Sequence, residues 1–176
     1  MNSQILFSKS QIQKRVGELA KLIAHDFKNE NPIIIGVLNG SYIFMSDLTQ
    51  KIWESGLTDF QVDFVGVSSY ENSSKSNTKP KLTRDTKIDI KGRNIILLED
   101  IYDTGYTLDY LLTEFMKRSP KTIKVASFLS KKDCHKIDIQ IDYLGFEINN
   151  VWVEGYGLDS AEFGRANPNI IKKQTT

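Results

Sequence analysis

Apolar and polar residues follow one another along the first half of the chain with the spacings of helices and buried strands. After Ser8 and Ser10, either of which could cap a helix, apolar residues recur every three or four positions, which predicts an amphipathic helix over residues 9–28. The continuous apolar run 32–38 has the length of a strand buried on both faces, and a helical pattern follows it as far as Gly56. Alternating apolar residues predict the next strand at 59–68.

The same order continues in the second half of the chain. Residues 94–98 predict a second buried strand, 99–107 a turn, and the apolar spacing from Leu108 predicts a helix that ends near Ser119. Residues 123–128 predict another strand. Strands that alternate with helices in this way require a parallel sheet with right-handed crossovers, so the pattern predicts an α/β fold.

A polar stretch interrupts the pattern at residues 69–81. It is rich in Ser, Asn, Lys and Thr and contains almost nothing to bury. A loop of this length is uncommon inside a compact domain unless it has a function or is disordered. We therefore expect a flexible lid at 69–81, with disorder without function as the alternative.

The residues after 136 differ from the alternating units before them. They contain short strand-like pieces at 141–147 and 150–154 and then a tail rich in Gly, Asp, Asn and Pro, which is typical of a cap laid over a sheet. We expect a single domain over 1–176, with a core at about 30–135 and a hood formed by about 1–10 and 136–176.

Composition and total charge exclude several classes of protein. With 40% apolar and 26% charged residues, the chain resembles ordinary soluble globular proteins. Its formal charge of +1 provides no general attraction to nucleic acid or to a membrane, and we expect neither partner. No apolar run approaches the roughly 18 residues that span a bilayer. The single cysteine, Cys134, excludes an intramolecular disulfide and predicts a reducing, cytoplasmic location.

The charge is nevertheless distributed unevenly. Residues 94–110 carry four carboxylates and no basic residue, whereas 117–136 carry seven basic residues and one acidic residue. Residues 71–93 are also mainly basic. Charged runs are most often solvated loops, but an acidic segment between two basic ones also suits a polyanion bound with a divalent metal.

The segment 95–108 carries the most specific chemistry. Its strand brings Glu99 and Asp100 to the carboxyl edge of the sheet, where open parallel sheets bind ligands, and Asp103 follows closely. Acidic residues before a helix are most often caps. Three carboxylates that end an apolar strand are harder to explain as caps, because repulsion and desolvation oppose such a group without a cation or hydroxyls to bind.

The turn after these acids is suited to a phosphate. Gly105 allows close approach of the backbone, Thr104 and Thr107 add hydroxyl donors, and the first amides of the following helix are unpaired. Carboxylates beside a phosphate cradle indicate a sugar phosphate. The sequence contains neither the G-x-G-x-x-G of a dinucleotide site after a strand nor the G-x-x-x-x-G-K-[ST] of a P-loop.

At this segment the sequence resembles the phosphoribosyltransferases that use 5-phosphoribosyl 1-diphosphate. Further matching segments follow in the family's order over about 160 residues: 37–41, 69–70, 125–132, 145–148 and 155–165. Together they resemble the hypoxanthine-guanine branch. The resemblance implies a Rossmann-like parallel sheet flanked by helices, the type I phosphoribosyltransferase fold, with a small hood. It also implies a homodimer or homotetramer that makes IMP or GMP in purine salvage.

The resemblance implies a role for each matching residue. Asp103 is expected to be the general base on purine N7. The ribose and 5′-phosphate are expected to contact Glu99, Asp100, Asp103, Thr104, Gly105, Tyr106 and Thr107. The expected diphosphate contacts are Asn39, Gly40, Ser69, Tyr70 and Arg165. The expected purine contacts are Lys131, Trp152, Val153 and Asp159. Mg²⁺ is the implied cofactor, with Glu99, Asp100 and Asp159 as ligands.

Several of these residues could instead have purely structural roles. Lys131 suits a solvated strand end, Trp152 suits the core, and Asp159 with Arg165 suits an exposed ion pair. His25 and His135 have no partner pattern and are expected to be structural or surface residues.

Departures from the family pattern concern base choice and the diphosphate site. Asn39 stands where many members have Lys, Asn149 and Asn150 replace a common Pro-Asp, Ser160 replaces an aromatic residue, and Gly164 precedes the arginine. They leave a xanthine-preferring enzyme as an alternative. A nucleotide-sensing RNA-binding regulator on the same fold is a second alternative, which the near-zero charge disfavours.

Overall fold

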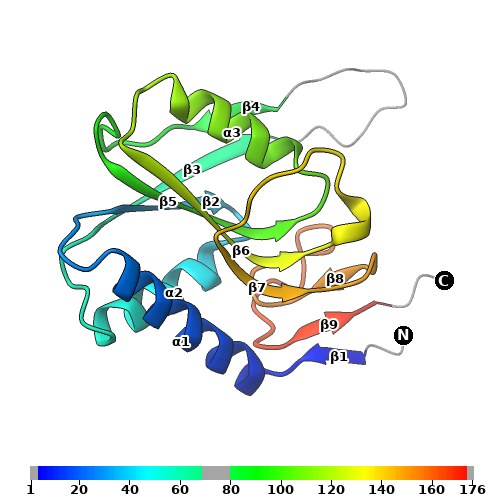
Figure 1. Ribbon diagram of the computed structural model, residues 1–176. Helices are drawn as coiled ribbons and strands as arrows, with labels where there is room; N and C mark the ends of the chain where they lie inside the picture. The colour runs from blue at the N-terminus through cyan, green and yellow to red at the C-terminus, as the bar shows by residue number, and fades with distance from the viewer. Residues whose placement is uncertain (1–3, 69–79, 174–176) are drawn as a thin grey trace.

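The computed structural model describes residues 4–68 and 80–173 and shows a six-stranded sheet with helices on both faces (Figure 1). The strand order is β4-β3-β2-β5-β6-β7, and all neighbours are parallel except β3 and β4. The strands are β2 (Ile33–Leu38), β3 (Gln61–Ser68), β4 (Lys81–Arg84), β5 (Asn94–Tyr102), β6 (Thr122–Ser130) and β7 (Tyr143–Glu147). The predicted α/β fold is confirmed, with an antiparallel strand added at one edge.

Helices cover the sheet on both faces. The helices α1 (Lys9–Asp26) and α2 (Tyr42–Glu54) lie on one face, and α3 (Tyr106–Met116) lies on the other (Figure 1). Helix α1 begins where the sequence predicts, because Ser8 and Gln11 form a capping box. The aliphatic strands β2 and β5 are buried on both faces and contribute side chains to both apolar clusters. Because β2 and β5 pair in parallel, their carboxyl ends lie at the same edge of the sheet.

Strand β5 is longer than the sequence predicts. The turn expected at 99–107 starts only after Tyr102, because β5 remains paired with β6 as far as Tyr102 and Ser130. The prediction was wrong for residues 99–102. Polar residues suggested the end of a strand, but the neighbouring strand supplies partners for their backbone groups. Glu99 and Asp100 therefore lie on rigid strand backbone.

The piece predicted at 141–147 does not belong to the cap. As β7 it pairs in parallel with β6 and extends the main sheet. The connection from β6 to β7 contains only the short 3-10 turn η1 (Lys132–Cys134), so the strand–helix–strand pattern that signals a crossover is missing from the sequence. Gly145 is required in this strand, since a Cβ there would lie 2.1 Å from the carbonyl oxygen of Phe128.

A small antiparallel sheet forms a cap beyond the carboxyl ends of the core strands (Figure 1). It contains β1 (Gln4–Phe7), β9 (Ile170–Lys172) and β8 (Val153–Glu154), in that order. The last of these is shorter than the predicted piece 150–154. Most of the predicted lid 69–81 lies outside the described residues, and its last residue begins β4. In the described part of the chain, no helix has the length and apolarity needed to cross a membrane.

Candidate active site

Two adjacent carboxylates lie near the carboxyl end of β5. The side chain of Glu99 is buried, and its Oε2 atom has no hydrogen-bond partner in the described structure. Burial, followed by the charge of Asp100, raises the pKa of Glu99 well above its ordinary range. Burial also raises the pKa of Asp100, although the backbone N–H of Ile101 donates to its Oδ1 over 2.9 Å. An orphaned buried carboxylate oxygen is costly, and it is typical of a site that binds a ligand.

Two glycines allow loops from distant parts of the chain to meet at this acidic pair. A Cβ on Gly40 would lie 1.6 Å from Oδ2 of Asp100. A Cβ on Gly157, whose φ is +99°, would lie 1.9 Å from the carbonyl oxygen of Gly40. The loop after β2 and the loop after β8 therefore contact each other beside β5.

The loop that the sequence predicts to bind phosphate, residues 103–107, leads from β5 into α3, and we call it the phosphate loop. Gly105 is the N-cap of α3 and has a φ of +94°, a conformation that favours glycine. The amides of the first turn of α3 lie directly after it, and the side chain of Tyr106 is exposed, while Thr104 and Thr107 are half-buried. This geometry leaves a helix N-terminus and two hydroxyls beside the acidic pair, as a phosphate requires.

Lys131 and Asp103 are brought together from 28 residues apart in the sequence. The Nζ atom of Lys131 donates to Oδ2 of Asp103 over 3.1 Å. The lysine side chain is 10% exposed, whereas the aspartate side chain is 43% exposed. The backbone N–H of Lys131 also donates to the carbonyl of Tyr102 over 2.9 Å. Lys131 is therefore no solvated strand-end lysine but a buried cation held against the phosphate loop.

Comparison with known proteins shows which protein family has this sequence and fold. Residues 3–161 match the family described as the phosphoribosyl transferase domain. The hypoxanthine-guanine phosphoribosyltransferase of Bacillus subtilis is 41% identical over 95% of this chain and 91% of its own length. That of Dictyostelium discoideum is 35% identical over 96% and 93%. A solved hypoxanthine-guanine phosphoribosyltransferase from Bacillus anthracis is 37% identical, with a TM-score of 0.89 over 97% of this chain and 98% of that one.

The chain belongs to the hypoxanthine-guanine phosphoribosyltransferase family. The family and the fold expected from the sequence are therefore both confirmed.

A cluster of three charged side chains lies between β8 and β9 of this phosphoribosyltransferase. Nη2 of Arg165 is 2.9 Å from Oδ1 of Asp159 and also 2.9 Å from Oε2 of Glu162, and Nη1 donates to the carbonyl of Gly157 over 2.9 Å. The arginine side chain is only 19% exposed. Because Gly157 contacts Gly40, these bonds anchor Arg165 at the loop that borders the acidic pair.

The expected purine contacts in the cap differ in burial. The side chain of Trp152 is 53% exposed, so the alternative that it is a core residue is wrong, whereas Val153 is buried. The backbone N–H of Lys173 donates to the carbonyl of Trp152 over 3.0 Å, which ties this strand to the carboxyl-terminal segment. The exposed indole ring can accept a stacking partner.

The remaining expected contacts lie in the loops. Asn39 is exposed and precedes the buried Gly40 at the start of the loop after β2, and its carbonyl accepts a bond from the backbone N–H of Tyr42. Ser69 and Tyr70 lie outside the described residues.

The expected Mg²⁺ ligands are only partly brought together. Within 4–68 and 80–173, no three His, Cys, Asp or Glu side chains converge as a metal-binding group. Asp159 instead pairs with Arg165. The acidic pair still fits the ion, because Glu99 has an unsatisfied buried oxygen and because Mg²⁺ is usually held by one or two carboxylates together with substrate phosphates.

Two aromatic residues that sequence reasoning did not connect support the phosphate loop. The rings of Tyr102 and His135 are stacked, with centroids 3.7 Å apart. Nothing in the spacing of these residues indicates the contact. A signal existed in Tyr102 alone, since a tyrosine that ends a buried strand needs a partner for its hydroxyl group.

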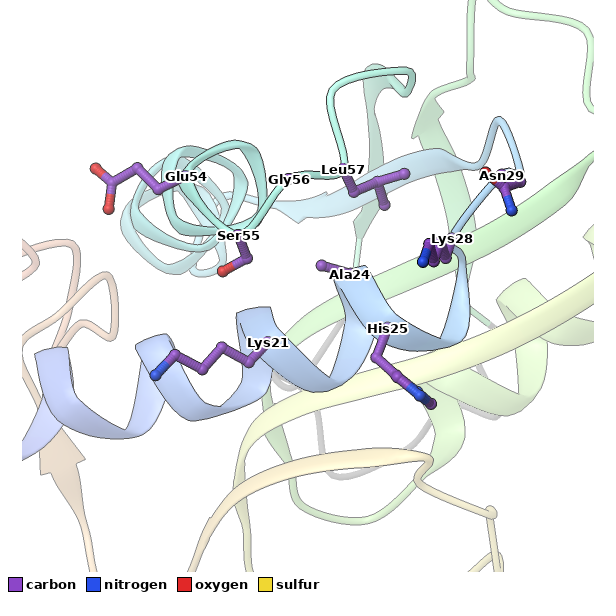
Figure 2. A pocket seen from close by; sticks show the side chains of 9 residues that line it. All are labelled: Lys21, Ala24, His25, Lys28, Asn29, Glu54, Ser55, Gly56 and Leu57. Atoms are coloured by element: carbon purple, nitrogen blue, oxygen red, sulfur yellow. The ribbon is translucent and has the colours of Figure 1, made fainter.

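A hollow of about 600 Å³ lies away from this site, where α1 and α2 end (Figure 2). In Figure 2, Lys21 and Glu54 both extend to the left from their helices without meeting, and His25 turns away from α2. The charged side chains do not converge, so the hollow presents no arrangement for chemistry.

Proposed function

We propose that this phosphoribosyltransferase transfers the 5-phosphoribosyl group from 5-phosphoribosyl 1-diphosphate to N9 of hypoxanthine or guanine. The products are IMP or GMP and diphosphate, so the reaction serves purine salvage. The observation that carries the proposal is the buried Lys131 paired with Asp103 beside the phosphate loop. Relatives 35% and 41% identical that are named hypoxanthine-guanine phosphoribosyltransferases support it.

Lys131 and Asp103 read one edge of the purine. A 6-oxopurine presents O6 and N7 side by side, and the two side chains are 3.1 Å apart at their charged ends. Lys131 donates a hydrogen bond to O6, and Asp103 accepts the proton from N7 as general base. The ammonium group draws electron density toward O6, which makes the N7 proton easier to remove as N9 attacks C1′ of the ribose.

The rest of the purine is held by the cap. The exposed indole of Trp152 stacks on the base, and the backbone of the buried Val153 reads its far edge with Asp159 nearby. The base is thereby oriented with N9 toward the ribose.

The phosphate loop binds the 5′-phosphate of the donor. Residues Asp103, Thr104, Gly105, Tyr106 and Thr107 surround it, with the backbone amides of the first turn of α3 and the two threonine hydroxyls as donors. Glu99 and Asp100 accept hydrogen bonds from the ribose hydroxyls. Since both carboxylates lie on rigid strand backbone, the ribose is oriented without a cost in loop ordering.

The departing diphosphate lies near the loop after β2. Asn39 and Gly40 contact it, and Arg165 supplies the positive charge that Asn39 lacks. Glu99 and Asp100 would hold Mg²⁺, with Asp159 beside a second ion, and bound Mg²⁺ would neutralise charge on the diphosphate. Contacts from Ser69 and Tyr70 to the diphosphate, and a lid at 69–81, stay predictions, as do assembly into a homodimer or homotetramer and a cytoplasmic location.

The two alternatives are less well supported. A xanthine-preferring enzyme would also need selection at C2 of the purine, and the relatives that are 35% and 41% identical are named for hypoxanthine and guanine. An RNA-binding regulator needs neither a buried lysine nor an exposed carboxylate paired with it.

Nucleotide formation from each of four bases tests the proposal. The enzyme is supplied with 5-phosphoribosyl 1-diphosphate, Mg²⁺ and hypoxanthine, guanine, xanthine or adenine, and products are separated by chromatography. We expect IMP and GMP as the main products. XMP as the dominant product would support the xanthine alternative, and no nucleotide from any base, with RNA bound by the same preparation, would support the regulator.

A further inference from the structure

Behind the phosphate loop lies a second segment, residues 135–139, which we call the brace. The backbone N–H groups of Lys136 and Ile137 both donate to the carbonyl of Thr104, over 2.9 and 3.2 Å. A Cβ on Gly105 would lie 2.8 Å from the carbonyl oxygen of Ile137 and 3.2 Å from the ring of Tyr102. The loop therefore rests directly on the brace and on the tyrosine ring.

The two bonds to Thr104 orient the peptide that follows it. In a trans peptide the C=O and the next N–H point in opposite directions. When the carbonyl of Thr104 points into the brace, the N–H of Gly105 points away from the brace and toward the ligand side of the loop. A phosphate cradle requires this polarity, since a carbonyl aimed at the phosphate would repel it.

Tyr102 connects the brace to the core of the protein. It is 2% exposed and is the last residue of β5. Its hydroxyl donates to the carbonyl of Ile137 over 2.6 Å and accepts from the N–H of Ile139 over 3.0 Å. Its ring stacks on His135, whose Nε2 is 3.2 Å from the hydroxyl of Ser130. One side chain thus holds the brace through two hydrogen bonds and a ring contact.

We infer that Tyr102 is a positioning residue for the donor's 5′-phosphate. It fixes the brace, the brace fixes the Thr104 peptide, and the peptide presents the Gly105 amide to the phosphate. The inference rests on the proposed function, because the phosphate belongs to the proposed donor. The side chain of Tyr102 is buried against the brace, so we expect its effect to fall on phosphate binding and to spare purine binding.

The first test replaces Tyr102 with phenylalanine, which keeps the ring and removes both hydroxyl bonds. We expect KM for 5-phosphoribosyl 1-diphosphate to rise about tenfold, which corresponds to about 1.4 kcal/mol, and KM for guanine to change less than about twofold. The matched control is Tyr143→Phe. Tyr143 is also buried, and its hydroxyl donates to Asp26 over 2.8 Å, between β7 and α1. This control should lose stability to a similar degree without a change in either KM.

Calorimetric titration with ribose 5-phosphate separates this inference from the proposed function. Binding needs no turnover, and Tyr102→Phe should weaken it about tenfold. Unchanged ribose 5-phosphate affinity and donor KM in an active Tyr102→Phe enzyme would overturn the inference and leave the function intact. An inactive wild type that binds ribose 5-phosphate more tightly than the variant would overturn the function alone. No binding by the wild type would overturn the inference.

Variants at His135 keep the inference testable if Tyr102→Phe does not fold. His135→Phe retains an aromatic partner for the ring, whereas His135→Ala removes it. We expect the alanine variant to raise the donor KM severalfold and the phenylalanine variant to restore it toward the wild-type value. Equal donor KM values in both variants and in the wild type would contradict a positioning role for the stack.

Discussion

Gly40 and Asp100 are in such close contact that no side chain fits between them. An added Cβ would lie 1.6 Å from Oδ2 of the aspartate and 2.4 Å from its Cγ. The contact joins the loop after β2 to the end of β5, which are the proposed diphosphate and ribose sites.

We expect Gly40→Ala to lower kcat/KM by about 100-fold, because the new methyl group displaces Asp100 by a distance that matters to reacting groups. The matched control is Gly17→Ala. Gly17 lies in α1, and no atom of another element lies within 4 Å of the place that an added methyl group would take. This change should therefore stabilise the helix by about 0.5–1 kcal/mol and leave activity unaltered. Wild-type kinetics in Gly40→Ala would show that the placement of Asp100 does not matter.

Replacing Asp103 with asparagine removes the proposed base and keeps its size. Because the amide oxygen can still accept a bond from Lys131, we expect little change in structure or in donor KM, with turnover lower by about 10²–10⁴-fold. Asp89→Asn is the control, since Asp89 is exposed and its Oδ1 accepts a bond from the N–H of Lys91. Normal turnover in Asp103→Asn would assign the N7 proton to another group.

The raised pKa of Glu99 gives stability a defined pH dependence. Its pKa lies above the ordinary value of 4.5 in the folded state, so the folded protein holds this proton to higher pH than the unfolded chain. The contribution of this protonated carboxyl to the free energy of unfolding is fully present below pH 4.5, and it is lost as the pH rises through the folded-state pKa. The pKa of Asp100 is also raised, so its contribution to the free energy of unfolding likewise falls as the pH rises above 3.8.

Glu99→Gln removes this ionisation. We expect the variant to be more stable than the wild type at pH 8, by about 0.5–2 kcal/mol, with the difference shrinking toward pH 4.5, and to be less active. Unfolding by urea at several pH values measures it, with the exposed Glu54→Gln as control. A pH-independent difference would show that burial does not perturb the ionisation of Glu99.

Removal of divalent metal should abolish turnover. The acidic pair offers two carboxylates beside the proposed diphosphate site, which is a donor set that suits Mg²⁺. Activity should disappear in excess chelator and return when Mg²⁺ is added back. Undiminished turnover in excess chelator would show that the reaction does not require a divalent metal.

Local sequence patterns predicted the elements that form this site but not the contacts between distant segments that bring them together. The acids at the end of an apolar strand, followed by Gly105 and a helical pattern, predicted the strand, the phosphate loop and α3, because each depends on neighbours in the chain. The contact of Gly40 with Asp100 and the stack of Tyr102 on His135 depend on how strands and loops pack across the sheet. No periodicity encodes such contacts.

The sequence pattern alone does not predict the contact between Lys131 and Asp103. Twenty-eight residues separate the two side chains, and a strand-end lysine is most often solvated. The family resemblance placed both at the base, and the sheet explains how they meet. Parallel pairing of β5 with β6 sets Tyr102 opposite Ser130, so the residue after each strand lies at the same edge.

Recognition of the 6-oxo group by Lys131 is measured by the ratio of kcat/KM for guanine to that for adenine, in the wild type and in Lys131→Gln. Guanine accepts a bond from Lys131 at O6, whereas adenine presents an amino group there and sets donor against donor. We expect the wild type to favour guanine on the order of 10⁴-fold. Lys131→Gln should lower the guanine value by about 10–100-fold and change the adenine value little, while the exposed neighbour variant Lys132→Gln should change neither. Efficient use of adenine by the wild type, or an equal loss for both bases in Lys131→Gln, would contradict 6-oxopurine recognition by this lysine.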